Sequence, residues 1–334
     1  MASGPAGPVP VVVMGLGFIG QQIARAALAS PELKLVGAVD ASPQLLGRKM
    51  SDLLGMPAAG AVVVTDDLTK ALGRHRRPVL LHATGSKLPQ VMDQLLAAVR
   101  GGACVVSTCE ELAFPYLKYA PLAEQLERAA VKAGVSVLGS GVNPGYVLDR
   151  LVATAGQVCG EIRHARVERV VDARSRREAL QRKIGAGLTE VEFDALAEKD
   201  QVGHVGLLES AALCALGLGL DCDDFEEEMV PVIAEEDISG GAFVVRRGRV
   251  AGIHQSAVAL SDGQERVRLE LTIAVGAENV GDRVVLESDP RLELEVKGGV
   301  AGDRATANVL VNAAARVSAA EPGLLTVLEL PAGR

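Results

Sequence analysis

The sequence predicts a Rossmann-type α/β domain, built on a doubly wound parallel sheet, and a second α+β domain with an open mixed or antiparallel sheet. Three observations support this fold class. A glycine fingerprint follows the first apolar strand, strand and helix patterns then alternate through the first half of the chain, and apolar and polar residues alternate along strands of the second half.

The chain begins its predicted fold with a strand, a glycine turn and a helix in VPVVVMGLGFIGQQIARAAL. Residues 9–14 are an apolar run typical of a parallel strand buried on both faces. Gly15, Gly17 and Gly20 follow as GxGxxG. The first glycine permits the tight turn, the second lets a pyrophosphate approach the backbone at the helix N-terminus, and the third lets helix and strand pack closely.

A second predicted strand, LKLVGAVD, ends in Asp40, at the position where a carboxylate can bind the ribose hydroxyls of a dinucleotide. This context favours cofactor binding over a purely structural glycine-rich turn. Asp40 would repel a 2′-phosphate, so the sequence favours NAD(H). Arg48 and Lys49 follow soon after and soften that preference, which keeps NADP(H) as the second option.

The alternation of strands and helices continues through the first half of the chain. Strands are predicted over 61–67, 78–86, 103–108 and 135–145, and helices over 86–102 and 119–134. In a doubly wound sheet, ligands bind beyond the carboxyl ends of the strands. We therefore expect the active-site rim to be formed by the loops 82–86, 107–111 and 139–146.

The pattern changes from about residue 160. A charged, strand-like segment covers residues 160–177, and a helix is predicted over 202–220. Strands with strict alternation follow at 266–275 and 291–296, and a helix of small residues is predicted over 301–320. Strict alternation indicates a sheet with one buried face. A cleft between the two domains would hold a small-molecule substrate against the nicotinamide.

Composition excludes several classes of function. A net charge of −8 and an aromatic content of 2% disfavour a nucleic-acid partner. No uninterrupted apolar segment approaches the length of a membrane span, and the uncharged N-terminus lacks the cationic region of a signal peptide. Five cysteines without CxxC spacing suggest neither a disulfide framework nor a zinc site. We expect a cytoplasmic protein with no membrane partner and no metal.

An unusual pair of acids, Glu110 and Glu111, follows the predicted strand at 103–108, in the segment STCEEL. Side chains of adjacent strand residues point to opposite faces, so an extended backbone would direct only one of Glu110 and Glu111 into a cleft. Both acids could instead be ordinary N-terminal helix residues. Cys109 suggests a thioester nucleophile, but two flanking acids would raise its pKa and disfavour that role. His204 and His254 are compatible with structural roles.

Several blocks, in this order, resemble one known family: GLGFIG (15–20), HATGS (82–86), STCEEL (107–112), GSGVNPGYVLD (139–149), GHVGLLES (203–210), ATANVLVNAAARV (305–317) and PGLLTVLELP. Over nearly its whole length the chain resembles the 2,4-diaminopentanoate dehydrogenase and native amine dehydrogenase family, distant relatives of dihydrodipicolinate reductase. Such enzymes use NAD(P) to oxidise a primary amine to a ketone or aldehyde plus ammonia through an iminium, or to aminate the carbonyl in reverse.

The resemblance implies roles for residues of this chain. The catalytic acid is expected to be Glu110, with Glu111 second. The expected cofactor-binding residues are Gly15, Gly17, Phe18, Ile19, Gly20, Asp40, Ala83, Thr84, Gly85, Ser86, Thr108, Cys109 and Asn143. Asn143 is also expected to line the substrate pocket with Tyr146, and the second domain is expected to add Arg169, His254 and Thr306.

The same resemblance implies a domain plan and a homodimer. Residues 1–143 would bind the dinucleotide, 144–303 would bind substrate and dimerise, and the last helix, from about 304 to 334, would return to the first domain. Three alternatives stay open: a diamine or amino-acid dehydrogenase, a reductase like dihydrodipicolinate reductase, and an NAD-binding sensor without turnover. The His-His and Lys motif of dihydrodipicolinate reductase has no counterpart here, which counts against that alternative.

Overall fold

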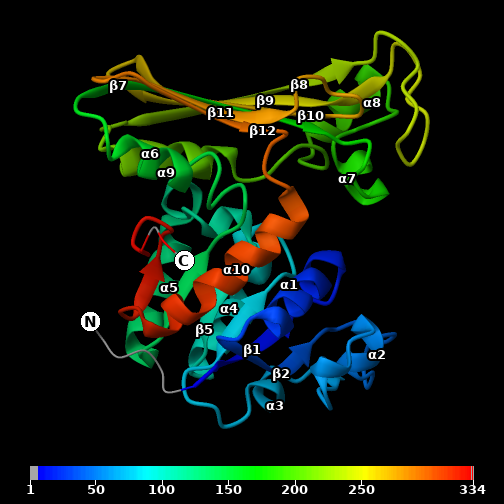
Figure 1. Cartoon of the computed structure of the whole chain (residues 1–334), viewed down its shortest axis with the longest axis vertical. Helices are drawn as coiled ribbons and strands as arrows, with labels where there is room; N and C mark the ends of the chain where they lie inside the picture. The colour runs from blue at the N-terminus through cyan, green and yellow to red at the C-terminus, as the bar shows by residue number, and fades with distance from the viewer. Residues whose placement is uncertain (1–6, 332, 334) are drawn as a thin grey trace. The chain divides into compact units, whose positions relative to one another are not determined.

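The computed structural model describes residues 7–331 and 333. The chain divides into two compact units, each built on its own sheet (Figure 1). The first unit contains the residues through Tyr146 together with those from Ala301 onward, and the second contains Val147–Val300. Among the described residues, no helix combines the length and the hydropathy that crossing a bilayer requires.

Parallel strands form the sheet of the first unit, in the order β13-β6-β5-β4-β1-β2-β3. They are β1 (Val9–Met14), β2 (Leu33–Val39), β3 (Val64–Thr65), β4 (Val79–His82), β5 (Cys104–Ser107), β6 (Ser136–Gly139) and β13 (Gly323–Leu325). The prediction of a parallel Rossmann-type sheet is confirmed. The strand order sets the ends of β1, β4, β5 and β6 side by side, which creates the edge where a site can form.

Helices follow most of these strands. They are α1 (Phe18–Ala29), α2 (Met50–Leu54), α3 (Leu68–Leu72), α4 (Leu88–Arg100), α5 (Tyr116–Ala133) and α10 (Gly302–Ala319), with the 3₁₀ turns η1 (Pro57–Ala59) and η2 (Glu110–Leu112). Although α10 lies near the end of the sequence, it packs beside α1 and against β4 and β5 (Figure 1). The C-terminal segment therefore completes the first unit.

The core of the first unit is aliphatic because the sequence offers few aromatic residues. Val11, Val12 and Val13 of the central strand β1 are fully buried, as expected for a strand covered on both faces. Helix α5 is kinked at Tyr119, where the backbone leaves helical geometry, two residues before Pro121. A proline cannot donate a backbone hydrogen bond to the preceding turn, which accounts for the kink.

The second unit contains a mixed sheet in the order β12-β11-β7-β10-β9-β8. Only β7 and β10 pair in parallel, and the other neighbours are antiparallel. The strands are β7 (Ile162–Asp172), β8 (Asp224–Ile233), β9 (Val250–Ser261), β10 (Gln264–Ala274), β11 (Gly281–Ser288) and β12 (Leu292–Lys297), and the helices are α6 (Arg150–Gly156), α7 (Glu178–Lys183), α8 (Glu190–Ala197) and α9 (Leu207–Leu218).

Strict alternation divides the two faces of this second sheet. In β10, Val267, Leu269 and Leu271 are buried, while Arg268 and Glu270 between them are only partly buried. Helix α9 packs against β8, β9 and β10, and Figure 1 shows α6 and α9 on the same face of the sheet. The predicted open mixed sheet with one apolar face is confirmed.

Candidate active site at the ends of the parallel strands

The glycine loop after β1 is packed so closely that two of its glycines have no room for a side chain. Gly15 has a positive φ of 85°, and a Cβ atom there would lie 2.4 Å from the carbonyl oxygen of Ala83. A Cβ atom on Gly20 would lie 1.7 Å from the carbonyl oxygen of Gly15. A Cβ atom on Gly17 would meet nothing within 4 Å. The middle glycine therefore faces open space, where a pyrophosphate could approach the backbone.

Asp40 connects the glycine loop to the loop after β2. One carboxylate oxygen accepts the Leu16 N–H at 2.6 Å, and the other accepts the Ser42 N–H at 2.8 Å. These bonds hold the negative charge of Asp40 beside the glycine loop, where a ribose would lie. Arg48 and Lys49 are exposed in the segment that follows.

The structure brings the three predicted rim loops into direct contact. Thr108 N–H donates to the carbonyl oxygen of His82 at 2.9 Å, and Ser140 N–H donates to that of Ser107 at 2.8 Å. Glu111 N–H donates to the carbonyl oxygen of Ser86 at 3.3 Å. The loops that follow β4, β5 and β6 thus form one continuous rim, next to the glycine loop at the end of β1.

The two adjacent acids occupy different environments. Residues 110–112 form η2 rather than an extended strand. The Glu111 side chain is buried, and its carboxylate accepts the Leu88 N–H at 2.7 Å and the Tyr119 hydroxyl at 3.3 Å. Leu88 is the first residue of α4, so the charge of Glu111 stabilises the N-terminus of that helix. Glu110 is only half-buried.

Cys109 is not a suitable nucleophile in this environment. Its side chain is buried, and its thiol donates to the carbonyl oxygen of Ser86 at 3.2 Å. Burial raises the pKa of the Cys109 thiol well above its usual value, and the charges of Glu110 and Glu111 raise it further. The thiolate that a covalent mechanism needs is therefore disfavoured, in agreement with the sequence argument.

The loop 139–146 is shaped by close backbone packing. Gly145 has a φ of 122°, and a Cβ atom there would lie 2.4 Å from the Gly141 nitrogen. Val142 N–H donates to the Thr306 hydroxyl at 3.3 Å. Thr306 lies on α10 in the first unit, in line with the expected return of the last helix, although it was grouped with pocket residues of the second domain. Tyr146 is exposed and Asn143 is half-buried.

The other two predicted pocket residues have structural partners within the second unit. Arg169 is buried and donates to Asp282 at 2.5 Å and to the Val300 carbonyl oxygen at 2.7 Å. This ion pair fixes the point where the chain leaves the second unit. His254 shares a 2.9 Å hydrogen bond with Thr272 on the sheet face that α9 does not cover. Neither arrangement supports a role in substrate binding.

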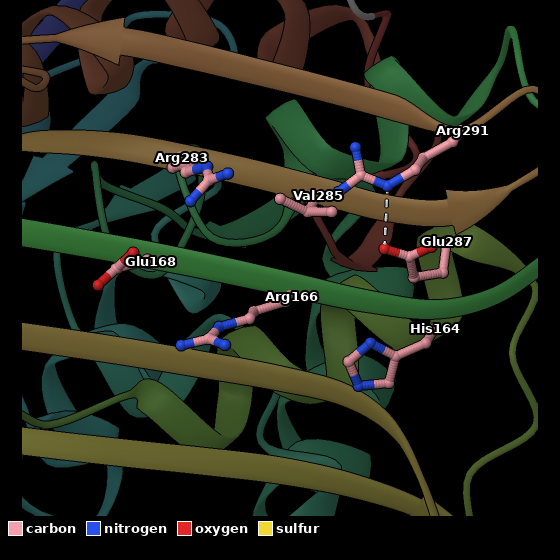
Figure 2. Close-up of a pocket in the computed structure, with 7 residues that line it drawn as sticks. All are labelled: His164, Arg166, Glu168, Arg283, Val285, Glu287 and Arg291. Atoms are coloured by element: carbon pink, nitrogen blue, oxygen red, sulfur yellow. Dashed lines mark hydrogen bonds and ion pairs between the residues drawn. The ribbon is translucent and has the colours of Figure 1, made fainter.

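A surface cavity of about 290 Å³ lies on that same uncovered face (Figure 2). Charged side chains from β7 and β11 dominate its lining, which consists of His164, Arg166, Glu168, Arg283, Val285, Glu287 and Arg291. Its three guanidinium groups pair with carboxylates of the same sheet. The cavity shares no residue with the rim, so we do not assign it to the active site.

Sequence reasoning missed a buried polar cluster at the rim. His82 and Ser107 are the last residues of β4 and β5, and Gln94 lies on α4. The available signal was a polar residue ending each of two otherwise apolar strands, VLLH and CVVS. No group of histidine, cysteine or acidic residues in the described part of the chain is arranged to hold a metal ion.

Comparisons with known proteins give consistent results. Residues 146–334 match the family model of the 2,4-diaminopentanoate dehydrogenase C-terminal domain, and residues 9–108 match that of the dihydrodipicolinate reductase N-terminus. The chain is similar to a 2,4-diaminopentanoate dehydrogenase of Acetoanaerobium sticklandii, with 28% identity over 98% of this chain and 94% of the relative. An amine dehydrogenase of Streptomyces virginiae is 23% identical over 97% and 96% of the two chains.

The fold of the whole chain also has a solved counterpart. The structure of an amine dehydrogenase from Mycobacterium smegmatis aligns with a TM-score of 0.85 and 24% identity, covering 98% of this chain and 97% of that one. The resemblance noted in the sequence and the predicted dehydrogenase fold are both confirmed.

The glycine loop generates a testable prediction. Gly17→Val should leave the melting temperature nearly unchanged, because a side chain there meets open space, but should weaken NAD binding by at least about tenfold (~1.4 kcal/mol). Gly20→Val is the matched control and should lower the melting temperature sharply, because its side chain would overlap the Gly15 carbonyl. Thermal unfolding and NADH titration measure both effects. Unchanged NAD affinity in Gly17→Val would contradict the assignment of this loop.

Proposed function

Because the chain belongs to the 2,4-diaminopentanoate dehydrogenase family, we propose that it is an NAD(P)-dependent amine dehydrogenase. The proposed reaction is the reversible oxidative deamination of a primary amine to a ketone or aldehyde plus ammonia. A hydride leaves the carbon that carries the amino group, the resulting iminium takes up water, and ammonia departs. The bound nicotinamide would accept the hydride in this direction and supply it in reverse.

The observation that carries the proposal is the placement of Glu110. It lies in η2 directly after β5, beside the loops that follow β1 and β4, where the nicotinamide of a Rossmann-type domain ends. The Glu111 carboxylate is hydrogen-bonded to the N-terminus of α4, so Glu110 is the residue of the pair that we propose to be catalytic. Its carboxylate would bind the substrate ammonium, accept a proton from it, and stabilise the positive charge of the iminium.

NAD(H) is the proposed cofactor, and NADP(H) is the alternative. The carboxylate of Asp40, held beside the glycine loop by the Leu16 N–H, supports NAD(H) because it would repel a 2′-phosphate. Exposed Arg48 and Lys49 support the alternative, since either cation could pair with that phosphate. The loop residues Ala83–Ser86, Thr108 and Asn143 are proposed to complete the cofactor site, with Tyr146 and Thr306 beside the substrate.

A diamine is the second candidate substrate class. The 28% identical relative carries the name 2,4-diaminopentanoate dehydrogenase, which supports testing diamines beside simple amines. A diamine would need a second polar partner for its distal ammonium, and this requirement separates it from a simple alkylamine.

The activity predicts a dependence on ammonium. With NADH or NADPH and a panel of ketones, aldehydes and amino ketones, cofactor oxidation at 340 nm should require ammonium, because the iminium is the species reduced. In the forward direction, the matching amines should reduce NAD more efficiently than NADP. Carbonyl reduction that proceeds equally well without ammonium would show an alcohol dehydrogenase. A chain that binds NADH and turns over no substrate of the panel would be the NAD-binding sensor.

Substitutions of the two acids should have different effects. Glu110→Gln should lower kcat by on the order of 10²–10⁴-fold, because it removes the proton acceptor, while the melting temperature stays near that of the wild type. Glu111→Gln should mainly lower the melting temperature, because it removes the charge at the N-terminus of α4. Steady-state kinetics and thermal unfolding separate the two effects. Full activity in Glu110→Gln would remove Glu110 from the mechanism.

A homodimer through the uncovered face of the second sheet is part of the proposal. Arg166 and Arg268 are register partners on this face, and two positions further along the same strands Glu168 and Glu270 are partners. Within one copy Arg166 pairs with Glu270 and Arg268 pairs with Glu265. A two-fold axis between the basic and the acidic pair would bring an opposite charge from a second copy to each, which makes the surface self-complementary. Val285, the register partner of Arg166 on β11, lies among the charged side chains of this face (Figure 2).

Charge reversal tests this dimer. The double variant Arg166→Glu/Arg268→Glu makes both pairs acidic, so a dimeric protein should become monomeric in light scattering after size-exclusion chromatography. Arg128→Glu on exposed α5 is the control and should leave the molar mass unchanged. A monomeric wild type would contradict the dimer.

A cytoplasmic setting is also proposed, because the five cysteines of the chain are free thiols, as expected in a reducing compartment. The recovery of activity outside the cell would contradict this setting.

A further inference from the structure

A chain of polar groups, with the buried His82 and Ser107 at its centre, connects the loops after β4 and β5. The His82 side chain is fully buried, and its Nδ1 lies 2.8 Å from the Ser107 hydroxyl oxygen. The two residues are register partners at the last positions of their strands. On the other side of the ring, Nε2 lies 2.8 Å from Gln94 Oε1 and 2.8 Å from the Thr84 hydroxyl.

The hydrogen-bond partners are consistent with one tautomer of a neutral imidazole. Burial lowers the pKa of His82, although the bond to Gln94 opposes this effect. Because the Gln94 Oε1 can only accept, Nε2 carries the proton and donates to it, and Nδ1 then accepts from the Ser107 hydroxyl. The Thr84 hydroxyl also donates to Gln94 Oε1, at 2.6 Å.

The chain continues from Ser107 into the turn that carries the acids. The Ser107 hydroxyl oxygen accepts the Cys109 N–H at 3.0 Å. Cys109 immediately precedes Glu110, so this bond fixes the backbone from which the Glu110 side chain starts. At the opposite end of the chain of hydrogen bonds, Thr84 lies in the loop 82–86. The preceding residue, Ala83, packs against Gly15 of the glycine loop. The polar chain therefore joins the glycine-loop side of the rim to the acid side.

We propose that His82 and Ser107 are positioning residues that hold Glu110 at a fixed place relative to the cofactor loop. This inference rests on the proposed function, because it gives the network a catalytic purpose. A buried histidine often serves only to satisfy its neighbours, but here its hydrogen bonds lead to two rim loops. Apolar side chains at both positions would pack in the core without needing partners. The polar pair instead specifies the geometry of the turn.

The first test compares two buried serines of the same sheet. Ser107→Ala removes the hydroxyl that binds both His82 and the Cys109 N–H. Ser136→Ala is the matched control, because Ser136 is equally buried but lies at the first position of β6, where its hydroxyl donates to backbone carbonyls at the other edge of the sheet. We expect Ser107→Ala to lower kcat on the order of tenfold or more, with a smaller change in KM for NAD, and Ser136→Ala to leave kcat within about twofold.

The second test separates the two sides of the imidazole. The amide of His82→Asn occupies the position of Nδ1 and can still bond with Ser107, whereas His82→Leu cannot. His82→Asn should therefore recover most of the kcat that His82→Leu loses. The limb of the pH–rate profile that reports Glu110 should move in His82→Leu and Ser107→Ala, but not in Ser136→Ala. Hydrogen exchange should be faster over residues 107–112 in the same two variants.

Each outcome decides the inference. If the wild type is active and Ser107→Ala matches Ser136→Ala in kcat and pH profile, the positioning role is overturned while the proposed function stands. If His82→Leu and His82→Asn lose kcat equally, the link through Ser107 is overturned. If none of the amines tested supports NAD reduction by the wild type, the proposed function fails. Unchanged hydrogen exchange over residues 107–112 in His82→Leu and Ser107→Ala would then overturn the positioning network as well.

Discussion

The contact between the glycine loop and the end of β4 is the constraint on which the first unit depends. Gly15 touches the Ala83 backbone and Gly20 touches Gly15, at distances that exclude any side chain. These contacts seat α1 directly on the strand ends, and they set the loop 82–86 beside the open backbone at Gly17. Because the ends of β4, β5 and β6 are hydrogen-bonded to one another, the position of the glycine loop also determines where the acids of η2 lie relative to it.

Two identical side chains at adjacent positions take different roles because the backbone turns between them. In η2 the Glu111 carboxylate is directed back toward the first residue of α4, where the helix N-terminus and the Tyr119 hydroxyl stabilise its charge. The kink of α5 at Tyr119 is part of this arrangement, because it is Tyr119 that reaches Glu111. The buried Glu111 thus holds in place the turn that carries the half-buried Glu110.

Local sequence patterns predicted the Rossmann-type sheet, the mixed second sheet and the rim loops, because these depend on periodicity and on glycine geometry within short segments. They could not predict contacts made across the sequence. The partners of Arg169 and Thr306 lie more than a hundred residues away in the sequence, so local patterns could not predict the buried ion pair or the contact with the loop 139–146. The sequence left both an extended and a helical backbone open at Glu110, and the structure has a 3₁₀ turn there.

Buried polar groups lie where the fold needs a fixed geometry, and the two units use them differently. In the second unit, Arg169 and Asp282 bind both the N–H and the carbonyl oxygen of Val300, so the ion pair fixes the chain just before α10 begins. Helix α10 then returns to the first unit and places Thr306 against the loop 139–146. In the first unit, His82 and Ser107 fix the turn before Glu110. Desolvating such groups is unfavourable unless each finds a partner, so the paired groups at the rim and at the return of the chain favour a single conformation at these two places.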